Sequence, residues 1–216
     1  MRDEPFEITT EILLRAYTLG IFPMSESRDQ HEIFWVDPKR RGILPIERFH
    51  ISRSLRRKIL KNPFRITFDK AFTQVISGCA DRQETWINTK IASLYEGLFD
   101  QGHAHSIEVW NDDRLVGGVY GVAIGAAFFG ESMFSRETDA SKIALAYLTY
   151  RLWKDGFTLF DTQFITDHLL SLGAEEISKS DYHKRLDAAV IRHALFRANA
   201  PLPSPYEITQ PRTQTS

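Results

Sequence analysis

Hydrophobic residues recur at helical spacing in six stretches of the chain. In the first, Ile12, Leu13 and Ala16 fall on one side of a helix predicted over residues 10–19, and Gly20 marks its end. The same spacing predicts helices over 52–61, 71–80, 90–102, 139–153 and 166–172.

Short apolar runs between these helices predict strands. Single strands are expected over 33–36, 64–68 and 157–163. Residues 106–110 and 114–120 flank a polar turn at 111–113, which is typical of a β-hairpin, and the second strand is expected to run on towards Phe129.

Two polar segments suggest how the chain is divided. Residues 37–42 read Asp-Pro-Lys-Arg-Arg-Gly, which is typical of a linker, so we expect a small domain over 1–37 and a larger one over 38–216. After about residue 199 the chain is rich in proline, serine and threonine, a composition that predicts disorder towards its end.

Charged or polar residues end two otherwise apolar runs. The glycine-rich run over 117–130 stops at Glu131, and the run over 157–160 stops at Asp161 and Gln163, whose spacing places both side chains on one face of a strand. A carboxylate is costly to remove from water unless a positive or hydrogen-bonding group meets it. The three residues are therefore candidates for a site, and the alternative is a hydrogen-bonded structural cluster.

Composition narrows the class of protein. With 216 residues, 43% hydrophobic and 25% charged, the chain can bury a substantial core. The formal net charge of −1 gives no global attraction to nucleic acid, so such binding has to rest on a local patch. Cys79 is the only cysteine, no apolar stretch is long enough to span a bilayer, and the first residues do not resemble a signal peptide. We therefore expect a cytoplasmic protein.

One such patch is the basic helix predicted over 52–61. Arg53, Arg57 and Lys61 share a face at helical spacing, which is the pattern expected for phosphate contacts or, alternatively, for a solvated helix surface. Trp86 has polar neighbours and fits either the edge of a core or a platform on which a base stacks.

The sequence contains no convincing set of metal ligands and no convincing covalent nucleophile. His103 and His105 could face the same way, but no third ligand stands at a matching spacing, so structural histidines are the better interpretation. Ser132 lies outside any Gly-x-Ser-x-Gly elbow, and Cys79 falls on the apolar side of a predicted helix. We expect no metal, no cofactor and no covalent nucleophile.

A series of rare strings resembles the bacterial leucyl/phenylalanyl-tRNA–protein transferases. The match runs in order from about Leu14 to Tyr182 and covers most of the chain. Its strings are LGIFP at 19–23, FHISRS at 49–54, TWI at 85–87, GHAHSIEVW at 102–110, LVGG at 115–118, GESMFSR at 130–136, ASK at 140–142, DTQ at 161–163 and SLGA at 171–174.

The resemblance implies an aminoacyltransferase that needs no cofactor. Such an enzyme moves leucine, phenylalanine and, less readily, methionine from aminoacyl-tRNA to the N-terminal α-amino group of proteins that begin with Arg or Lys, which marks them for degradation by the N-end rule. The implied fold is α+β, with a small N-terminal domain and a GCN5-related acetyltransferase-like domain whose mixed sheet is largely antiparallel. A monomer without membrane contact is expected.

The resemblance also implies roles for individual residues. Arg53, Arg57 and Lys61 would contact the acceptor stem of tRNA. Trp86 would stack on the terminal adenosine, with Met24 opposite it where some relatives have tryptophan. The pocket for the transferred side chain would be lined by Val119, Phe128, Gly130, Leu148, Leu152 and Phe160.

Asp161 and Gln163 would form the catalytic pair, and Glu131 with Asp161 would supply the counter-charge for a basic acceptor. An amide is a very weak base, so orientation of the amine, with Asp161 stabilising the developing ammonium, is the role expected of the pair.

Two other functions are compatible with parts of this pattern. An acyl-CoA N-acetyltransferase would share the implied fold, but the chain shows no Gln/Arg-x-x-Gly-x-Gly/Ala loop for the pyrophosphate. A non-catalytic module that binds tRNA or degrons would keep the basic helix and would not depend on Asp161.

Overall fold

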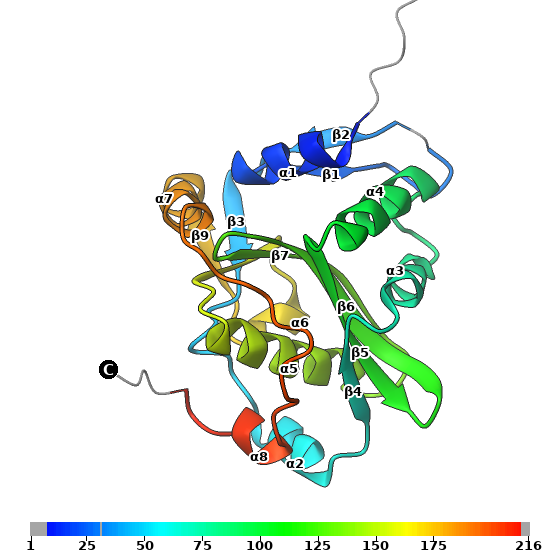
Figure 1. Cartoon of the computed structure of the whole chain (residues 1–216), viewed down its shortest axis with the longest axis vertical. Helices are drawn as coiled ribbons and strands as arrows, with labels where there is room; N and C mark the ends of the chain where they lie inside the picture. The colour runs from blue at the N-terminus through cyan, green and yellow to red at the C-terminus, as the bar shows by residue number, and fades with distance from the viewer. Residues whose placement is uncertain (1–7, 31, 213–216) are drawn as a thin grey trace, which may run out of the picture.

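A seven-stranded mixed sheet with helices on both faces forms the centre of the molecule (Figure 1). The computed structural model describes residues 8–30 and 32–212. Neighbouring strands follow the order β4-β5-β6-β7-β8-β3-β9, and every neighbouring pair is antiparallel except β7 and β8, which are parallel. The strands are β3 (Arg40–Ile43), β4 (Arg65–Phe68), β5 (Ala104–Asn111), β6 (Arg114–Ile124), β7 (Ala127–Ser135), β8 (Leu159–Gln163) and β9 (Glu175–Ser178).

The long strands β5, β6 and β7 form a continuous meander. The hairpin between β5 and β6 was expected, but the prediction that the second strand continues to Phe129 is wrong, because the chain reverses after Ile124. Gly125 makes this turn with φ +57°, and a Cβ there would lie 2.4 Å from the carbonyl oxygen of Val190. Glu131 therefore lies inside β7 instead of at the end of a strand.

Each face of the sheet has its own hydrophobic cluster, because successive strand residues point to opposite sides. On one face lie α3 (Phe72–Ala80) and α4 (Thr89–Asp100), with α1 (Thr10–Thr18) and α7 (Lys179–Val190) packed beside them. On the other face α5 (Ala140–Lys154) crosses the central strands and is covered in turn by α2 (Arg53–Lys61) and α8 (Pro205–Ile208). The short helix α6 (Asp167–Leu170) follows β8. All six helices predicted from hydrophobic spacing are present.

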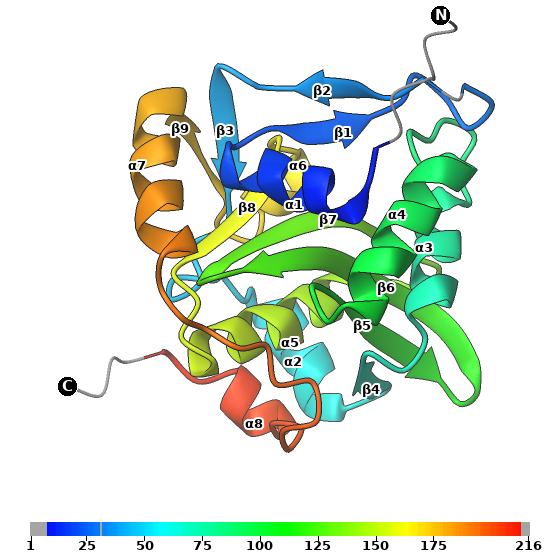
Figure 2. The ribbon, with the colours of Figure 1, turned by 45° about the horizontal axis from the view of Figure 1, so that its top comes forward.

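A separate two-stranded sheet lies beside the main one near the N-terminus (Figure 2). It pairs β1 (Phe22–Met24) with β2 (Phe34–Val36) in antiparallel register. The segment predicted as a linker, 37–42, is partly wrong, since β3 starts at Arg40 and lies between β8 and β9 in the main sheet. The domain division at residue 37 stays a prediction, and residues 1–7 and 31 of the small domain lie outside the described residues.

The segment after residue 199 is ordered as far as residue 212. Ile208 is fully buried, and the Arg151 guanidinium donates to the carbonyl oxygens of Ala200 and Pro201 at 3.2 and 2.9 Å. Arg212 donates to Thr149 Oγ1 at 2.8 Å and to the carbonyl oxygen of Ile46. The expected disorder therefore does not extend to residues 199–212, because apolar burial and buried arginines fix a segment whose composition is polar. Residues 213–216 lie outside the described part.

No helix within residues 8–30 and 32–212 combines the length and the apolar character that crossing a bilayer requires.

Candidate active site

A cavity opens where the parallel strands β7 and β8 stop pairing. The two strands pair only from Ala127 with Leu159 to Phe129 with Asp161. Beyond that point the cavity has a volume of about 230 Å³. Its walls come from β1, β6, β7, α5, α6, the end of β8 and the loop before α4, and its lining residues are Phe22, Met24, Arg82, Trp86, Val119, Gly130, Glu131, Ser132, Met133, Leu145, Phe160, Thr162, Gln163, Phe164, Thr166 and Leu169.

Glu131 enters this cavity because β7 carries a β-bulge. Tyr120 of β6 lies opposite Ser132, whereas the next residue, Gly121, lies opposite Gly130, so Glu131 is the extra residue without a partner. Gly121 permits this geometry, since a Cβ there would lie 2.2 Å from the carbonyl oxygen of Phe129. The bulge thus turns a carboxylate into a cavity whose lining is otherwise mostly apolar and, among the described residues, contains no other carboxylate.

The Glu131 carboxylate is only half satisfied. Its Oε2 accepts a hydrogen bond of 2.6 Å from the Tyr95 hydroxyl, which in turn lies 2.6 Å from the Tyr17 hydroxyl. Its Oε1 is buried and has no hydrogen-bond partner among the described residues. Burial raises the pKa of Glu131 to about 7, although the hydrogen bonds from the tyrosines act in the opposite direction. Near neutral pH this group can therefore take up or release a proton.

Asp161 has the opposite environment. It is completely buried, and it does not line the cavity. Arg41 donates to both carboxylate oxygens, from Nε at 2.9 Å and from Nη2 at 2.6 Å, and the Tyr182 hydroxyl donates at 2.7 Å. The Arg41 guanidinium also donates to the carbonyl oxygen of Gly20 and lies over the rings of Phe22 and Tyr182. The charge of Asp161 is thus already matched inside the protein.

Gln163 connects Asp161 to the strand that carries Glu131. Its backbone N–H donates to Asp161 Oδ1 at 2.8 Å, and its φ of +57° turns the chain at the end of β8. The carboxamide is assigned with its nitrogen towards the carbonyl oxygens of Gly130, at 2.8 Å, and Thr162, at 3.2 Å, so that the nitrogen and not the oxygen faces these two acceptors. The prediction that Asp161 and Gln163 face the same way is wrong, because only Gln163 lines the cavity.

Met24 and Trp86 both line the cavity. Their segments are held together by a hydrogen bond from Ser25 Oγ to the carbonyl oxygen of Trp86, 61 residues further along the chain. Met24 ends β1, and Trp86 lies in the loop before α4, with its ring edge-on to Tyr95. This arrangement agrees with the expected pair around a base. Their role stays a prediction.

Three of the six apolar residues expected in the pocket line the cavity, namely Val119, Gly130 and Phe160. Phe128, Leu148 and Leu152 do not, since they are fully buried in the core cluster on the α5 face of the sheet. The α5 residue that does reach the cavity is Leu145, about one helical turn before Leu148. The resemblance thus implied that α5 contributes to the pocket, but the residues it implied lie one or two turns beyond the turn that lines the cavity.

The basic residues of α2 lie apart from the cavity. Arg53, Arg57 and Lys61 are exposed, and none of them lines it. In Figure 2 α2 lies on the far side of α5 from β1 and β2. Any ligand that contacts both α2 and the cavity has to extend across the molecule.

The remaining candidate groups have structural explanations. His105 Nδ1 lies 2.7 Å from Asp69 Oδ2, and its ring stacks on Phe196. Among the described residues no three His, Cys, Asp or Glu side chains gather as metal ligands would. Burial raises the pKa of the Cys79 thiol to about 12, so it is not a nucleophile at neutral pH.

Several residues of the site were missed from the sequence. Arg41 was assigned to a solvated linker, and Tyr182 lay in a stretch without a predicted element. Tyr17 and Tyr95 fall on the apolar faces of α1 and α4, where their pattern is that of core residues. A usable signal was the need of a buried Asp161 for a positive partner, although the sequence alone does not say which arginine supplies it.

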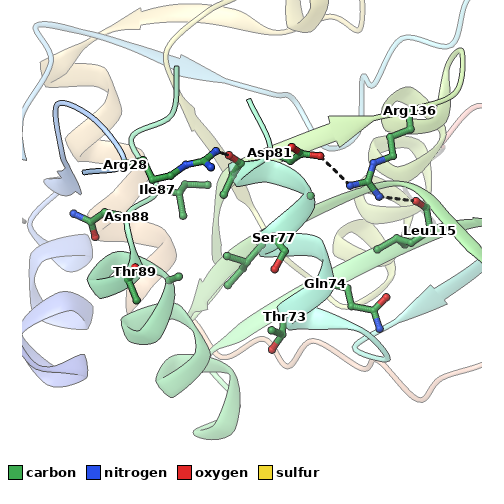
Figure 3. Close-up of a pocket in the computed structure, with 14 residues that line it drawn as sticks. Arg28, Thr73, Gln74, Ser77, Asp81, Ile87, Asn88, Thr89, Leu115 and Arg136 are labelled. Carbon is green, nitrogen blue, oxygen red and sulfur yellow. Dashed lines mark hydrogen bonds and ion pairs between the residues drawn. The ribbon is translucent and has the colours of Figure 1, made fainter. Parts of the chain in front are cut away.

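A wider groove of about 700 Å³ lies next to the cavity, between α3 and the start of α4 (Figure 3). The loop over 80–88 separates the two hollows, since Trp86 lines the cavity and Ile87 lines the groove. Arg28 and Arg136 stand at the groove's edge, where Arg136 donates to the carbonyl oxygen of Leu115 and pairs with Asp81 at 3.3 Å.

Comparison with known proteins gives consistent results along the whole chain. A family model described as leucyl/phenylalanyl-tRNA protein transferase matches residues 43–187, and the model of the N-terminal domain of the same family matches residues 6–39. A leucyl/phenylalanyl-tRNA–protein transferase of Roseobacter denitrificans is 59% identical over 97% of this chain and 99% of its own length. One from Cereibacter sphaeroides is 58% identical over 98% of this chain and 99% of its own length.

The fold also resembles a solved structure of distant sequence. FemX superimposes with a TM-score of 0.53 at 12% identity, over 78% of this chain and 66% of that one. The α+β fold with a mixed, largely antiparallel sheet that the resemblance implied is confirmed, and FemX shares this fold.

Proposed function

The chain belongs to the leucyl/phenylalanyl-tRNA protein transferase family, and from this premise we propose that the cavity between β7 and β8 holds the aminoacyl group of a charged tRNA during its transfer to a protein. The protein is an aminoacyltransferase that uses aminoacyl-tRNA, as the resemblance implied. The observation that carries the placement is the buried Glu131 Oε1, which has no partner among the described residues and belongs to the only carboxylate that lines this cavity.

The acceptor is the N-terminal α-amine of a protein that begins with Arg or Lys. A cationic acceptor needs a negative group at the cavity, and Glu131 is the only carboxylate among the lining residues. Asp161, expected to share this task, is neutralised by Arg41 and is not accessible from the cavity. The counter-charge is therefore assigned to Glu131 alone.

The reaction requires removal of one proton from the attacking amine. The amine nitrogen forms a bond to the ester carbonyl carbon, the bond from that carbon to the ribose oxygen breaks, and the ribose leaves as a hydroxyl. Glu131 Oε1 takes the proton from the amine, and the leaving oxygen takes up one proton. A carboxylate whose pKa lies near 7 suits this exchange, because it is basic enough to accept the proton and acidic enough to return it.

Gln163 and Asp161 contribute by orienting the reacting groups. The Gln163 amide oxygen can accept a hydrogen bond from the incoming amine, while its nitrogen stays on the carbonyl oxygen of Gly130. Asp161 holds the Gln163 backbone through the N–H bond and is itself fixed by Arg41 and Tyr182. In this arrangement Asp161 is a positioning residue, and much of the rate comes from orientation of the two reactants.

The cavity's apolar lining accounts for the donor set of leucine, phenylalanine and, less readily, methionine. Its volume of about 230 Å³ suits one such side chain together with part of the ester. All three amino acids are unbranched at Cβ, whereas valine and isoleucine are wider next to the reacting carbonyl. A difference of this kind discriminates by roughly 1–3 kcal/mol per methylene.

The rest of the donor extends outwards from the cavity. Trp86 and Met24 bracket the terminal adenosine, and the exposed stripe of Arg53, Arg57 and Lys61 contacts acceptor-stem phosphates. Phosphate contacts carry no sequence information, which suits an enzyme that accepts tRNAs of more than one kind. The protein acts as a monomer in the cytoplasm.

The decisive measurement is transfer of labelled leucine from Leu-tRNA to short peptides. We expect transfer to peptides that begin with Arg or Lys, and at least tenfold slower transfer to the same peptide beginning with Asp. Equal rates for the basic and acidic peptides would contradict the assignment of Glu131 as the counter-charge. Absence of transfer from both Leu-tRNA and Phe-tRNA would overturn the proposed function.

A further inference from the structure

A second cavity of about 490 Å³ adjoins the one that we assign to the aminoacyl group. Arg82, Met133 and Thr166 line both, so the two cavities share a wall. The second cavity also borders the groove of Figure 3 through Gly78, Asp81 and Arg136. A ligand that leaves the first cavity past Arg82 enters the second one directly.

Among the charged side chains that line this second cavity, cations outnumber carboxylates. Two guanidinium groups, of Arg82 and Arg136, stand against one carboxylate, that of Asp81, which is largely exposed and already paired with Arg136 at 3.3 Å. Ser135 and Ser141 contribute hydroxyls. His168 Nε2 is buried without a partner among the described residues, and burial together with Lys142 lowers its pKa, so the ring is a neutral donor or acceptor.

The position of the cavity matters as much as its lining. On its far side the chain over 136–139 leads into α5, and Lys58 of α2 donates to the carbonyl oxygen of Thr138 at 2.8 Å. The second cavity therefore lies between Trp86, at the aminoacyl site, and α2, which carries the exposed basic stripe. A strand that runs from one to the other passes over it.

We propose that this second cavity binds the phosphodiester on the 5′ side of the terminal adenosine of the tRNA 3′ end. The inference rests on the proposed function, which places that adenosine beside Trp86. Arg82 and Arg136 supply the charge, and their planar guanidinium groups match the oxygens of a phosphate. Ser141 and His168 supply neutral donors on the opposite wall. The single-stranded end of the tRNA is thus held at two points, one on the base and one on the phosphate.

A charge placed in the cavity tests this assignment, and a neutral variant of the same size accounts for the loss of the Ser141 hydroxyl. Ser141 lies in the first turn of α5, where an acidic residue favours the helix, so Ser141→Asp is expected to fold. Ser141→Asn adds the same bulk without the charge and is the matched control. Lys184→Gln, on α7 and far from the cavity, controls for a change in net charge.

The donors for the test are two small molecules that differ only in phosphate. One is phenylalanyl-adenosine with a free 5′-hydroxyl, and the other is the same compound with a 5′-phosphate methyl ester, a phosphodiester. With wild-type protein and an Arg-peptide we expect kcat/KM to be about tenfold higher for the phosphodiester, mainly through KM. Ser141→Asp should lower this ratio at least fivefold relative to Ser141→Asn, and Arg136→Gln should lower it in the same direction.

The outcomes separate this site from the proposed function. If the wild-type protein transfers phenylalanine but shows no gain from the phosphodiester, or if Ser141→Asp and Ser141→Asn give the same ratio, the phosphate site is overturned and the function stands. If neither donor nor Phe-tRNA supports transfer, the proposed function itself fails. Melting curves of each variant exclude a general loss of fold as the cause.

Discussion

Glu131 and Asp161 lie on neighbouring strands, but their carboxylates differ in hydrogen-bond partners and in access to the cavity. Glu131 has a free, buried oxygen at the cavity, whereas Asp161 accepts hydrogen bonds from Arg41, Tyr182 and the Gln163 backbone. One carboxylate thus keeps an oxygen that can exchange a proton, and the other has both oxygens engaged by hydrogen bonds inside the protein. Different surroundings give the same functional group two different tasks.

The first prediction concerns the pH dependence of transfer. With the pKa of Glu131 at about 7, wild-type kcat should rise between pH 6 and 8 as this group ionises. Glu131→Gln should lower kcat about 10²–10³-fold and remove that step, leaving only the ionisation of the acceptor amine near pH 8. Rates measured against pH with an Arg-peptide test this, and a step that persists near pH 7 in the variant would exclude Glu131 as the proton acceptor.

The same ionisation should affect stability with a defined sign. The folded-state pKa of Glu131 lies above the ordinary value of 4.5, so the protonated form is favoured in the folded protein. This contribution is complete below about pH 4.5 and is lost as the pH rises through about 7. Relative to wild type, Glu131→Gln should therefore gain up to roughly 3 kcal/mol in unfolding free energy between pH 5 and pH 8. Urea unfolding at both pH values provides the measurement.

The third residue-scale prediction separates positioning from proton transfer at Asp161. Arg41→Met should destabilise the protein by about 3–5 kcal/mol, because it leaves a buried carboxylate without its cation. The double variant with Asp161→Asn should recover part of that loss. Asp161→Asn alone should lower kcat yet keep the ionisation near pH 7; if that step disappears instead, the roles of the two carboxylates are reversed.

Asp161 and Gln163 were identified from the sequence because an apolar run ended in polar groups. Arg41 was not identified. Arg41 follows Lys39 and Arg40, and one buried arginine within a run of cations has no local signature. Its partner lies 120 residues away, and a pairing over that separation depends on how the strands are ordered in the sheet. Short-range pattern predicts which residues are costly to bury. It does not predict which residues meet them.

At the scale of elements, the β-bulge in β7 decides where Glu131 points. Its register shift lets Glu131 leave the regular alternation of faces, so counting residues along the strand could not place this side chain. The six helices, in contrast, were predictable, because each one buries an apolar face that repeats within a few residues. Strands β3 and β9 were missed, since each is four residues long and mixes charged with apolar positions.

The bulge itself is testable through Gly121. A Cβ at this position would lie 2.2 Å from the Phe129 carbonyl oxygen and 2.6 Å from the Phe128 ring, both inside the core. Gly121→Ala should therefore cost at least about 2 kcal/mol of unfolding free energy and lower kcat by displacing Glu131. Gly102→Ala is the control, because a Cβ there meets nothing within 4 Å and only the φ of +76° is strained, at about 1 kcal/mol. Equal effects of the two substitutions would show that the bulge is not constrained by Gly121.

At the scale of the whole molecule, the C-terminal segment connects parts that are distant in sequence. Residues 199–212 cover α5, place Ile208 in the core beside α2, and give the buried Arg151 its hydrogen-bond acceptors. A polar composition predicted disorder because it contains few apolar residues. In this segment the burial of one isoleucine and the hydrogen bonds of two arginines fix the chain despite its polar composition.

Truncation gives the prediction at this scale. Removal of residues 200–216 should lower the unfolding free energy by several kcal/mol, since it exposes the surface covered by Ile208, worth about 1.5–3 kcal/mol, and leaves Arg151 without acceptors. Removal of residues 213–216 alone is the matched control. Chemical denaturation of both forms checks this, and equal midpoints would show that α8 does not contribute to stability.

The short pairing between β7 and β8 has a consequence for how such a scaffold can change over evolutionary time. Three residues of ladder close the sheet, and past them a side-chain amide, that of Gln163, takes over the task of a backbone partner by reaching the Gly130 carbonyl oxygen. The point where the two strands diverge is therefore one determinant of the opening, besides β1 and the loop before α4. Among related proteins, we therefore expect a longer pairing of these two strands to accompany a narrower cavity and a shorter pairing to accompany a wider one.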